Sequence, residues 1–281
     1  MWLVAAIVIA ASAGLLLFGR WRWHAGTELL HRNLNAARTP AAASQYSERD
    51  LIGLPEPVRR YFLRALTDGQ RRVRAVRISH RGQFNAGGAR ERWAPFISDQ
   101  RVVTRRPGFV WDARIAMAPG LTVRVHDAYV AGQGELEAKL LGLIPVTTER
   151  PTTDLARGEL MRYVAEAAWY PTALLPGEGV TWEPMDDRTS RVTFRDGEVS
   201  VSLVFSFDDA GVISAVRAED RGRILNGVVT PTPWEGRWSR HEMCDGMCIP
   251  MEGEVAWLLP EGRQPYWRGR ITRIVYEWES E

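Results

Sequence analysis

Residues 158–176 read GELMRYVAEAAWYPTALLP, and this stretch decides the fold. It is a long segment with a clear helical period between two blocks of strand-like sequence. At 100° per residue, one face of the helix carries Leu160, Met161, Val164, Ala167 and Ala168. The other face carries Glu159, Arg162, Tyr163, Glu166, Trp169 and Tyr170. Three large rings are unusual on a solvated face, so both faces are expected to pack against the rest of the chain. Pro171 should end the helix at about Trp169.

Most of the remaining chain alternates between polar and apolar residues with the period of a β-strand. The expected strands are 73–84, 91–97, 100–105, 109–116, 121–131, 180–183, 191–195, 199–207, 212–221, 236–244, 249–259 and 266–279, while 135–143 fits either a strand or a short helix. A further helix should follow the prolines at 55 and 57. The sequence therefore predicts an α+β fold in which a large, curved, half-barrel-like antiparallel sheet of about 10–12 strands wraps the central helix.

The N-terminus begins with an apolar run over residues 2–18, bracketed by Trp2, Trp21 and Trp23. A transmembrane anchor at 1–23 is expected, followed by a partly helical stalk and linker at 24–50 and a single domain at 51–281. A cleaved signal peptide is the alternative, although no basic residue precedes the run. Arg20, Arg22 and Arg32 follow it, which favours a single-pass protein of the inner membrane with a cytoplasmic body.

The small net charge of +2 conceals an uneven distribution. Residues 1–126 contain 20 Lys and Arg against 8 Asp and Glu, whereas residues 127–281 contain 16 against 26. A basic half next to an anchor suits an anionic membrane surface. The alternative is that the positive charge of the first half and the negative charge of the second half neutralise each other within one domain. Nucleic acid is not expected as a partner, because the arginines form no recognised motif with aromatic residues.

Five segments carry a family resemblance: LPEPVRRYFLRAL at 54–66, the 158–176 stretch, GVTWEPMDD at 179–187, TPWEGRWSR at 232–240 and IPMEGEVAWLLP at 249–260. Together they resemble a family of membrane-anchored bacterial proteins known as a domain of unknown function, over roughly residues 51–278. The resemblance brings no activity and no catalytic residue. The order of elements is also similar to the open half-barrel of lipoprotein carriers of the LolA type, which is an analogy of architecture.

The helix and nearby tryptophans supply the candidate ligand-binding residues. They are Glu159, Arg162, Tyr163, Glu166, Trp169, Tyr170, Trp182 and Trp234. Indole rings combine an apolar body with one N–H donor and suit amphiphilic ligands, but they are also common core residues. The charged residues can bind a polar head group, perform acid/base chemistry or form ordinary helical ion pairs. Asp127, near the end of an expected strand, is interpreted as a turn acceptor.

Motifs for familiar chemistry are missing from the sequence, which has no phosphate loop, nucleophile elbow or HExxH segment. Cys244 and Cys248 flank Asp245-Gly246-Met247, so free thiols, a disulfide and a metal site all remain open there, with free thiols favoured. No cofactor and no metal are expected, and no protein partner is identified. We expect a membrane-anchored protein that binds a lipid or another apolar ligand between sheet and helix. The alternatives are a scaffold that docks through its basic half and a hydrolase-like enzyme using Glu159 or Glu166.

Overall fold

The computed structural model describes residues 1–40, 44–87, 91–149, 151–177, 179–225 and 228–279. The helices are α1 (Trp2–Ala36), α2 (Glu56–Ala65) and α3 (Thr153–Glu166), with 3₁₀ turns at η1 (Glu48–Leu51), η2 (Ala167–Trp169) and η3 (Pro171–Leu174). The strands are β1 (Val73–Asn85), β2 (Trp93–Val103), β3 (Gly108–Ala118), β4 (Leu121–Val130), β5 (Gln133–Leu140), β6 (Ile144–Glu149), β7 (Val180–Pro184), β8 (Thr189–Asp196), β9 (Val199–Phe207), β10 (Ile213–Leu225), β11 (Val228–Cys244), β12 (Met247–Leu259) and β13 (Gly262–Trp278).

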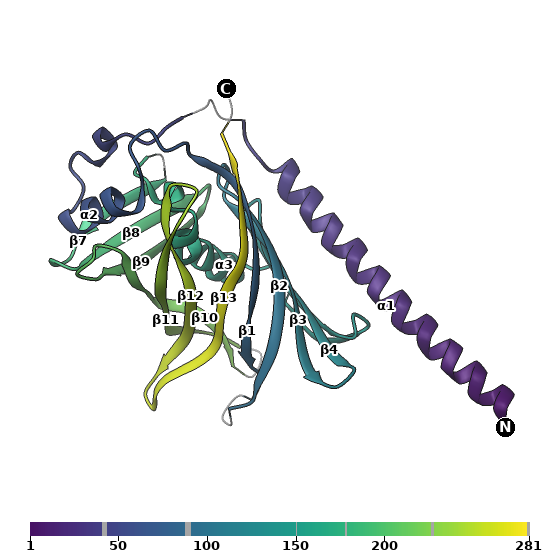
Figure 1. The fold of residues 1–281 in the computed structure, drawn as a ribbon. Helices are drawn as coiled ribbons and strands as arrows, with labels where there is room; N and C mark the ends of the chain where they lie inside the picture. Colours follow the sequence, from purple (N-terminus) through teal and green to yellow (C-terminus); the bar gives the residue numbers. More distant parts are fainter. Residues whose placement is uncertain (41–43, 88–90, 150, 178, 226–227, 280–281) are drawn as a thin grey trace.

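One antiparallel sheet contains all thirteen strands of the described residues, in the order β6-β5-β4-β3-β2-β1-β13-β12-β11-β10-β9-β8-β7. It curves around α3, which lies on its concave side (Figure 1). The predicted α+β class, the curved antiparallel sheet and the central helix are therefore confirmed. The sheet is open, since β6 and β7 are its two edges. A hydrogen bond of 2.8 Å from Tyr129 on β4 to Asp196 on β8 joins the two halves across the concave side.

Three strand boundaries differ from the sequence expectation. The expected strands at 91–97 and 100–105 form one continuous β2, because Ser98 and Gln100 turn inward and Asp99 outward, which keeps the alternation. In the segment 135–143, which fitted a strand or a helix, residues 135–140 belong to the strand β5 and residues 141–143 form the turn to β6. β11 begins eight residues before the expected 236 despite two prolines. Both prolines precede Trp234, the first residue of β11 that pairs with β12, so they interrupt no ladder on that side.

The central helix begins earlier than its sequence pattern indicates. Thr152 is its N-cap and accepts a 3.1 Å hydrogen bond from the Leu155 N–H. The α-helix ends at Glu166 and continues as the turn η2 to Trp169, after which Tyr170 leaves the helical region with φ −140° and ψ 66° ahead of Pro171. The predicted apolar face is buried at Leu160, Met161 and Val164. Strands β3, β4, β5, β9 and β10 surround the helix, so its other face is enclosed as well.

The N-terminal helix α1 packs against the convex face of the sheet over its second half. The residues expected as a helical stalk continue α1 to Ala36, and part of the expected linker, residues 41–43, lies outside the described residues. Leu30 and Leu34 form a small second core with residues of β1–β4. Trp23 stacks on His126 at 3.8 Å and donates a 3.0 Å hydrogen bond to Asp112. The same Asp112 also accepts a 3.0 Å hydrogen bond from Thr27.

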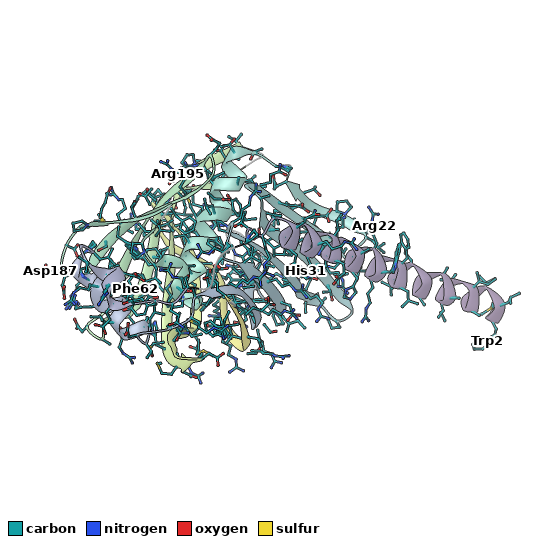
Figure 2. All side chains as sticks on the ribbon, turned by 90° about the horizontal axis from the view of Figure 1, so that it is seen from above. Trp2, Arg22, His31, Phe62, Asp187 and Arg195 are labelled. Atoms are coloured by element: carbon teal, nitrogen blue, oxygen red, sulfur yellow. The ribbon has the colours of Figure 1, made fainter. Side chains whose placement is uncertain are left out.

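The first half of α1 projects from the body, with Trp2 at its far end and Arg22 near the point where it reaches the sheet (Figure 2). Among the described residues, α1 is the one helix long and apolar enough to cross a membrane. Length and composition of this kind are also found in signal sequences.

Candidate functional site

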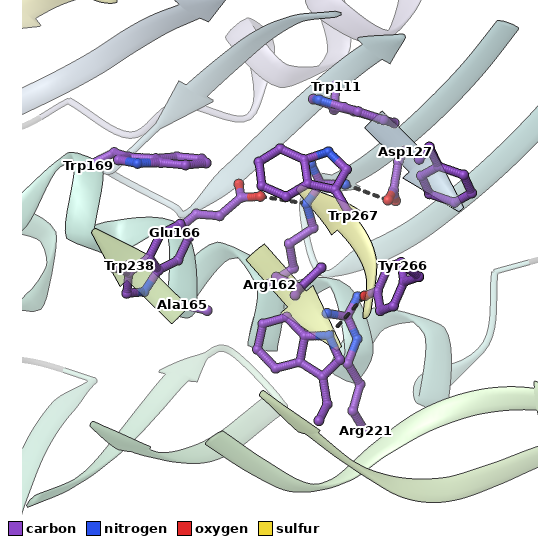
Figure 3. Close-up of a pocket in the computed structure, with 13 residues that line it drawn as sticks. Trp111, Asp127, Arg162, Ala165, Glu166, Trp169, Arg221, Trp238, Tyr266 and Trp267 are labelled. Carbon is purple, nitrogen blue, oxygen red and sulfur yellow. Dashed lines mark hydrogen bonds and ion pairs between the residues drawn. The ribbon is translucent and has the colours of Figure 1, made fainter. Parts of the chain in front are cut away.

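A cavity of about 80 Å³ lies between α3 and the concave face of the sheet (Figure 3). Its walls come from α3 and from strands on both sides of the sheet centre. Seven of its lining residues are aromatic, four are charged and two are aliphatic: Phe84, Trp111, Asp127, Arg162, Ala165, Glu166, Trp169, Arg221, Trp234, Trp238, Val255, Tyr266 and Trp267. The cavity has room for several water-sized groups and is smaller than the ~300–1,000 Å³ typical of ligand pockets.

Arg162 is the centre of the polar part of this site. Its Nε donates a 2.8 Å hydrogen bond to Glu166, one helical turn further along α3, and its Nη1 donates a 2.5 Å hydrogen bond to Asp127 on β4. The guanidinium also lies over the rings of Phe109 and Trp111, at 4.8 and 4.9 Å from their centroids. Burial opposes its charge, but the carboxylates of Glu166 and Asp127 outweigh burial and raise the pKa of Arg162. Arg162 therefore stays cationic.

Two neighbours complete the surroundings of this ion pair. Gln100 on β2 donates a 2.6 Å hydrogen bond to the second oxygen of Glu166, so both oxygens of that carboxylate are engaged. His80 on β1 lies 4.9 Å from Trp169, ring centre to ring centre. Burial, followed by the positive charge of Arg162, lowers the pKa of His80 to about 3. His80 is therefore neutral at physiological pH.

A second charged pair, Arg221 and Glu159, lies near the first. Arg221 on β10 is 3.8 Å from the carboxylate of Glu159 and 4.9 Å from the centroid of the Trp234 ring. Burial, and then the nearby Asp127 carboxylate, raise the pKa of Glu159 well above its ordinary value. Glu159 therefore takes up a proton more readily than an exposed carboxylate does.

Three indole N–H groups on the cavity wall have no hydrogen-bond partner among the described residues. They belong to Trp111, Trp169 and Trp238, each at most 5% exposed. By contrast, Trp234 donates a 2.8 Å hydrogen bond to the Tyr266 hydroxyl. Buried donors are almost always paired, because an unpaired one costs about 1–3 kcal/mol. The three nitrogens are inaccessible even to a water molecule, so the ring carbons of these side chains, and not their N–H groups, face the cavity.

Glycines on the neighbouring strands make room for these rings. An added Cβ at Gly269 would lie 2.7 Å from the Trp267 ring, and one at Gly253 would overlap the Trp238 ring. Gly253 and Gly269 are direct cross-strand partners on β12 and β13. The paired glycines let two indoles lie flat across the sheet, and this places both rings on the cavity wall.

Four of the eight residues predicted to bind a ligand line the cavity: Arg162, Glu166, Trp169 and Trp234. Glu159 lies behind the wall. Tyr163 and Tyr170 pack on each other, and Tyr163 meets Phe194 of β8 at 5.7 Å. Trp182 donates to the Leu174 carbonyl at 3.0 Å and packs in the core. The helical pattern placed the predicted residues of 158–176 on one face of the helix. The sheet encloses α3 on several sides, so different strands cover different parts of that face and only some of its residues reach the cavity.

Sequence reasoning missed several residues of this site. Asp127 is not a turn acceptor but lies within β4, where it pairs with Arg162. Trp111, Trp238 and Trp267 lie in strands that were predicted, and the inward phase of each strand was the signal that could have selected them. Tyr266 follows no such phase, because it sits beside Trp267 at a bulge in the pairing of β12 with β13. Which strands meet across the concave side depends on the curvature of the sheet, which local patterns do not encode.

The two cysteines lie away from this site, at the β11–β12 hairpin. Cys244 pairs in register with Met247, and Met243 with Cys248, so the turn contains two residues rather than the expected three. Both thiols are free.

A larger hollow of about 1110 Å³ lies elsewhere, among turn residues such as Arg106, Gly132 and Gly197. It contains none of the buried ionic groups described above. The aromatic cavity is therefore the better candidate for a specific site.

Comparison with solved structures gives weak similarity at low sequence identity. A domain of an outer-membrane lipoprotein-sorting protein from Vibrio parahaemolyticus is 11% identical over 74% of this chain and 86% of its own, with a TM-score of 0.38. A DUF1329 family protein from Desulfovibrio piger is 11% identical over 74% and 88%, with a TM-score of 0.38. A LolA superfamily protein from Nitrosomonas europaea is 10% identical over 89% and 93%, with a TM-score of 0.32.

No curated protein shows significant similarity to the sequence. A family model does match, over residues 52–276, which is close to the extent of the resemblance described above. The chain belongs to the family of unknown function DUF6920.

Proposed function

We propose that this protein binds an amphiphilic or apolar molecule, such as a lipid, in the aromatic cavity between α3 and the sheet, while α1 anchors it in the inner membrane with a cytoplasmic body. The aromatic cavity, with the Arg162 cation in its wall, is the observation that carries the proposal. Aromatic walls suit an apolar group, and a cation in the wall selects one that presents an acceptor oxygen.

The size of the cavity limits what it can hold without a change of shape. About 80 Å³ accepts the carbonyl or carboxyl end of a chain, or a small part of it, rather than a whole lipid. A ligand oxygen would meet the cation of Arg162. The cations of Arg162 and Arg221 balance the carboxylates of Asp127 and Glu166 on the cavity wall.

A hydrolase-like role for Glu159 or Glu166 has less support from the geometry. Glu159 does not line the cavity, and both oxygens of Glu166 accept hydrogen bonds from Arg162 and Gln100. A general base needs a free lone pair within reach of the substrate proton.

A photoreactive fatty acid tests the proposal in the full chain. The diazirine-bearing fatty acid is added to membranes containing the protein, and labelled peptides are mapped by mass spectrometry after illumination. We expect label on α3 and at Val255 of β12, which lines the cavity, in addition to α1, which reports contact with the bilayer. Ala165→Leu fills the cavity from α3 and should remove the first two signals while α1 stays labelled. Leu155→Phe, on the same helix but away from the cavity, is the matched control. Label on α1 alone in the wild type would refute binding in the cavity.

A further inference from the structure

Exposed apolar side chains collect on hairpins at one end of the sheet. Val228 is 63% exposed and Ile144 is 60% exposed. We call this set the rim: Leu121, Ile144, Val146, Ile224, Leu225, Val228 and Val229. Large apolar side chains gathered on strand ends mark a surface that contacts another apolar phase.

The sheet register places these hairpins at the same end. The β11–β12 turn contacts Thr67, just beyond α2, so the β10–β11 and β12–β13 hairpins must point the opposite way. Phe84, near the end of β1, pairs with Trp267, near the start of β13, so the end of the β1–β2 hairpin lies on the β12–β13 side. Because each strand from β1 to β6 runs antiparallel to the next, the β3–β4 and β5–β6 hairpins lie at the same end as the β1–β2 hairpin. Figure 1 shows these strand ends on the side toward which the N-terminal half of α1 points.

The apolar helix leaves the body at this same end. Gly19 is buried against the β5–β6 turn, where an added Cβ would lie 2.7 Å from the Leu141 carbonyl oxygen. The free apolar part, residues 2–18, is about 26 Å long at 1.5 Å per residue. This length is close to the ~30 Å hydrocarbon core of a bilayer. If α1 crosses a bilayer, the β5–β6 turn therefore lies at the bilayer surface.

Positive charge is concentrated beside the same turn. Arg114 and Arg124 are direct cross-strand partners on β3 and β4. The Arg124 side chain also reaches within 3.4 Å of a Cβ added at Gly142. Burial, together with the charges of Arg114 and Arg20, lowers the pKa of Arg124. Within the described ranges, none of these three arginines has a carboxylate within ion-pair distance. Like charges placed opposite each other are unfavourable unless an external anion neutralises them.

We propose that the rim rests on the surface of the bilayer that α1 enters, with Arg20, Arg114 and Arg124 on anionic phospholipid head groups. This inference rests on α1 being a membrane anchor, not on the cavity binding a ligand. It gives the anchored body one fixed orientation. Cavity residues such as Phe84, the second-last residue of β1, lie toward the rim, so the bilayer and the cavity are neighbours.

Site-specific fluorescence quenching tests the orientation in the full chain. Cys244→Ala and Cys248→Ala remove the native thiols, and single cysteines at Val228, Ile144, Leu16 and Ile52 carry a bimane label. The protein is reconstituted in phosphatidylcholine vesicles that contain brominated phosphatidylcholine, with or without phosphatidylglycerol. Val228 is the decisive position, because its hairpin is remote from α1 in the sheet order. Ile52, exposed beside α2 at the other end, is the reference.

We expect bromolipid to quench the Val228 label severalfold more strongly than the Ile52 label, and phosphatidylglycerol to increase that difference. Arg114→Gln combined with Arg124→Gln should abolish the increase, whereas Arg59→Gln with Arg60→Gln on α2 should leave it unchanged. Equal quenching at Val228 and Ile52 would overturn the proposal. A Leu16 label that is not quenched would overturn it too, by removing the anchor. Neither result depends on whether the cavity holds a ligand.

Discussion

Arg162 pairs with two carboxylates that come from different elements, Glu166 on α3 and Asp127 on β4. Removing one partner of a buried ion pair leaves the others charged and unpaired, which costs about 3–5 kcal/mol. Arg162→Met should therefore lower the free energy of unfolding by this amount, measured by urea denaturation of the solubilised full chain. Arg157→Met on the same helix breaks a more exposed pair with Asp220 and should cost less than about 1 kcal/mol. Equal losses in the two variants would contradict the central role of Arg162.

His80 makes the fold sensitive to acid. Its pKa is lowered from 6.5 to about 3 by burial and by Arg162, so the unfolded chain binds a proton that the folded chain does not. The protonation of this group therefore does not affect the free energy of unfolding above pH 6.5. Between pH 6.5 and pH 3 the free energy of unfolding falls by about 1.4 kcal/mol for each unit that the pH drops. His80→Phe should reduce the dependence of unfolding free energy on pH by one proton. His126, whose pKa is lowered to about 4, acts in the same direction and stays in the variant. An unchanged slope would contradict this assignment.

At the scale of elements, the packing of α1 on the sheet depends on one face of its second half. Trp23→Ala removes the ring stacked on His126 and the hydrogen bond to Asp112. Hydrogen exchange at the amides of residues 24–36 should accelerate by several orders of magnitude, because a buried tryptophan contributes about 3–5 kcal/mol. Trp21→Ala removes an equally large but exposed ring two residues earlier and should leave exchange there unchanged. Similar exchange in both variants would show that α1 is held by other contacts.

The elements themselves were largely predictable, because strand and helix periods are local. β6 escaped prediction since its apolar residues, Ile144 and Val146, are exposed and flank a proline, so they resemble a loop. The start of α3 was placed too late because its first turn depends on the Thr152 cap rather than on apolar spacing. The helix register placed Arg162 and Glu166 on one face, and both line the cavity.

At the scale of the whole molecule, long-range contacts complete the site. Asp127 and Arg162 are 35 residues apart, and Gln100 and Glu166 are 66 apart. No spacing in the sequence links such pairs. They meet because the sheet bends around α3, and that bend depends on features spread across many strands, including the paired Gly253 and Gly269.

The open sheet has a mechanical consequence for this site. β6 and β7 are separate margins, and the described residues contain no backbone ladder between them. Moving the two edge strands apart therefore breaks side-chain contacts, such as the hydrogen bond from the Tyr129 hydroxyl to Asp196, and leaves the backbone hydrogen bonds between strands intact. One such bond to a charged group contributes about 1.5–3 kcal/mol. A bulky guest that enlarges the interior therefore works against side-chain contacts alone, whereas in a closed cylinder it would first have to break a strand pair.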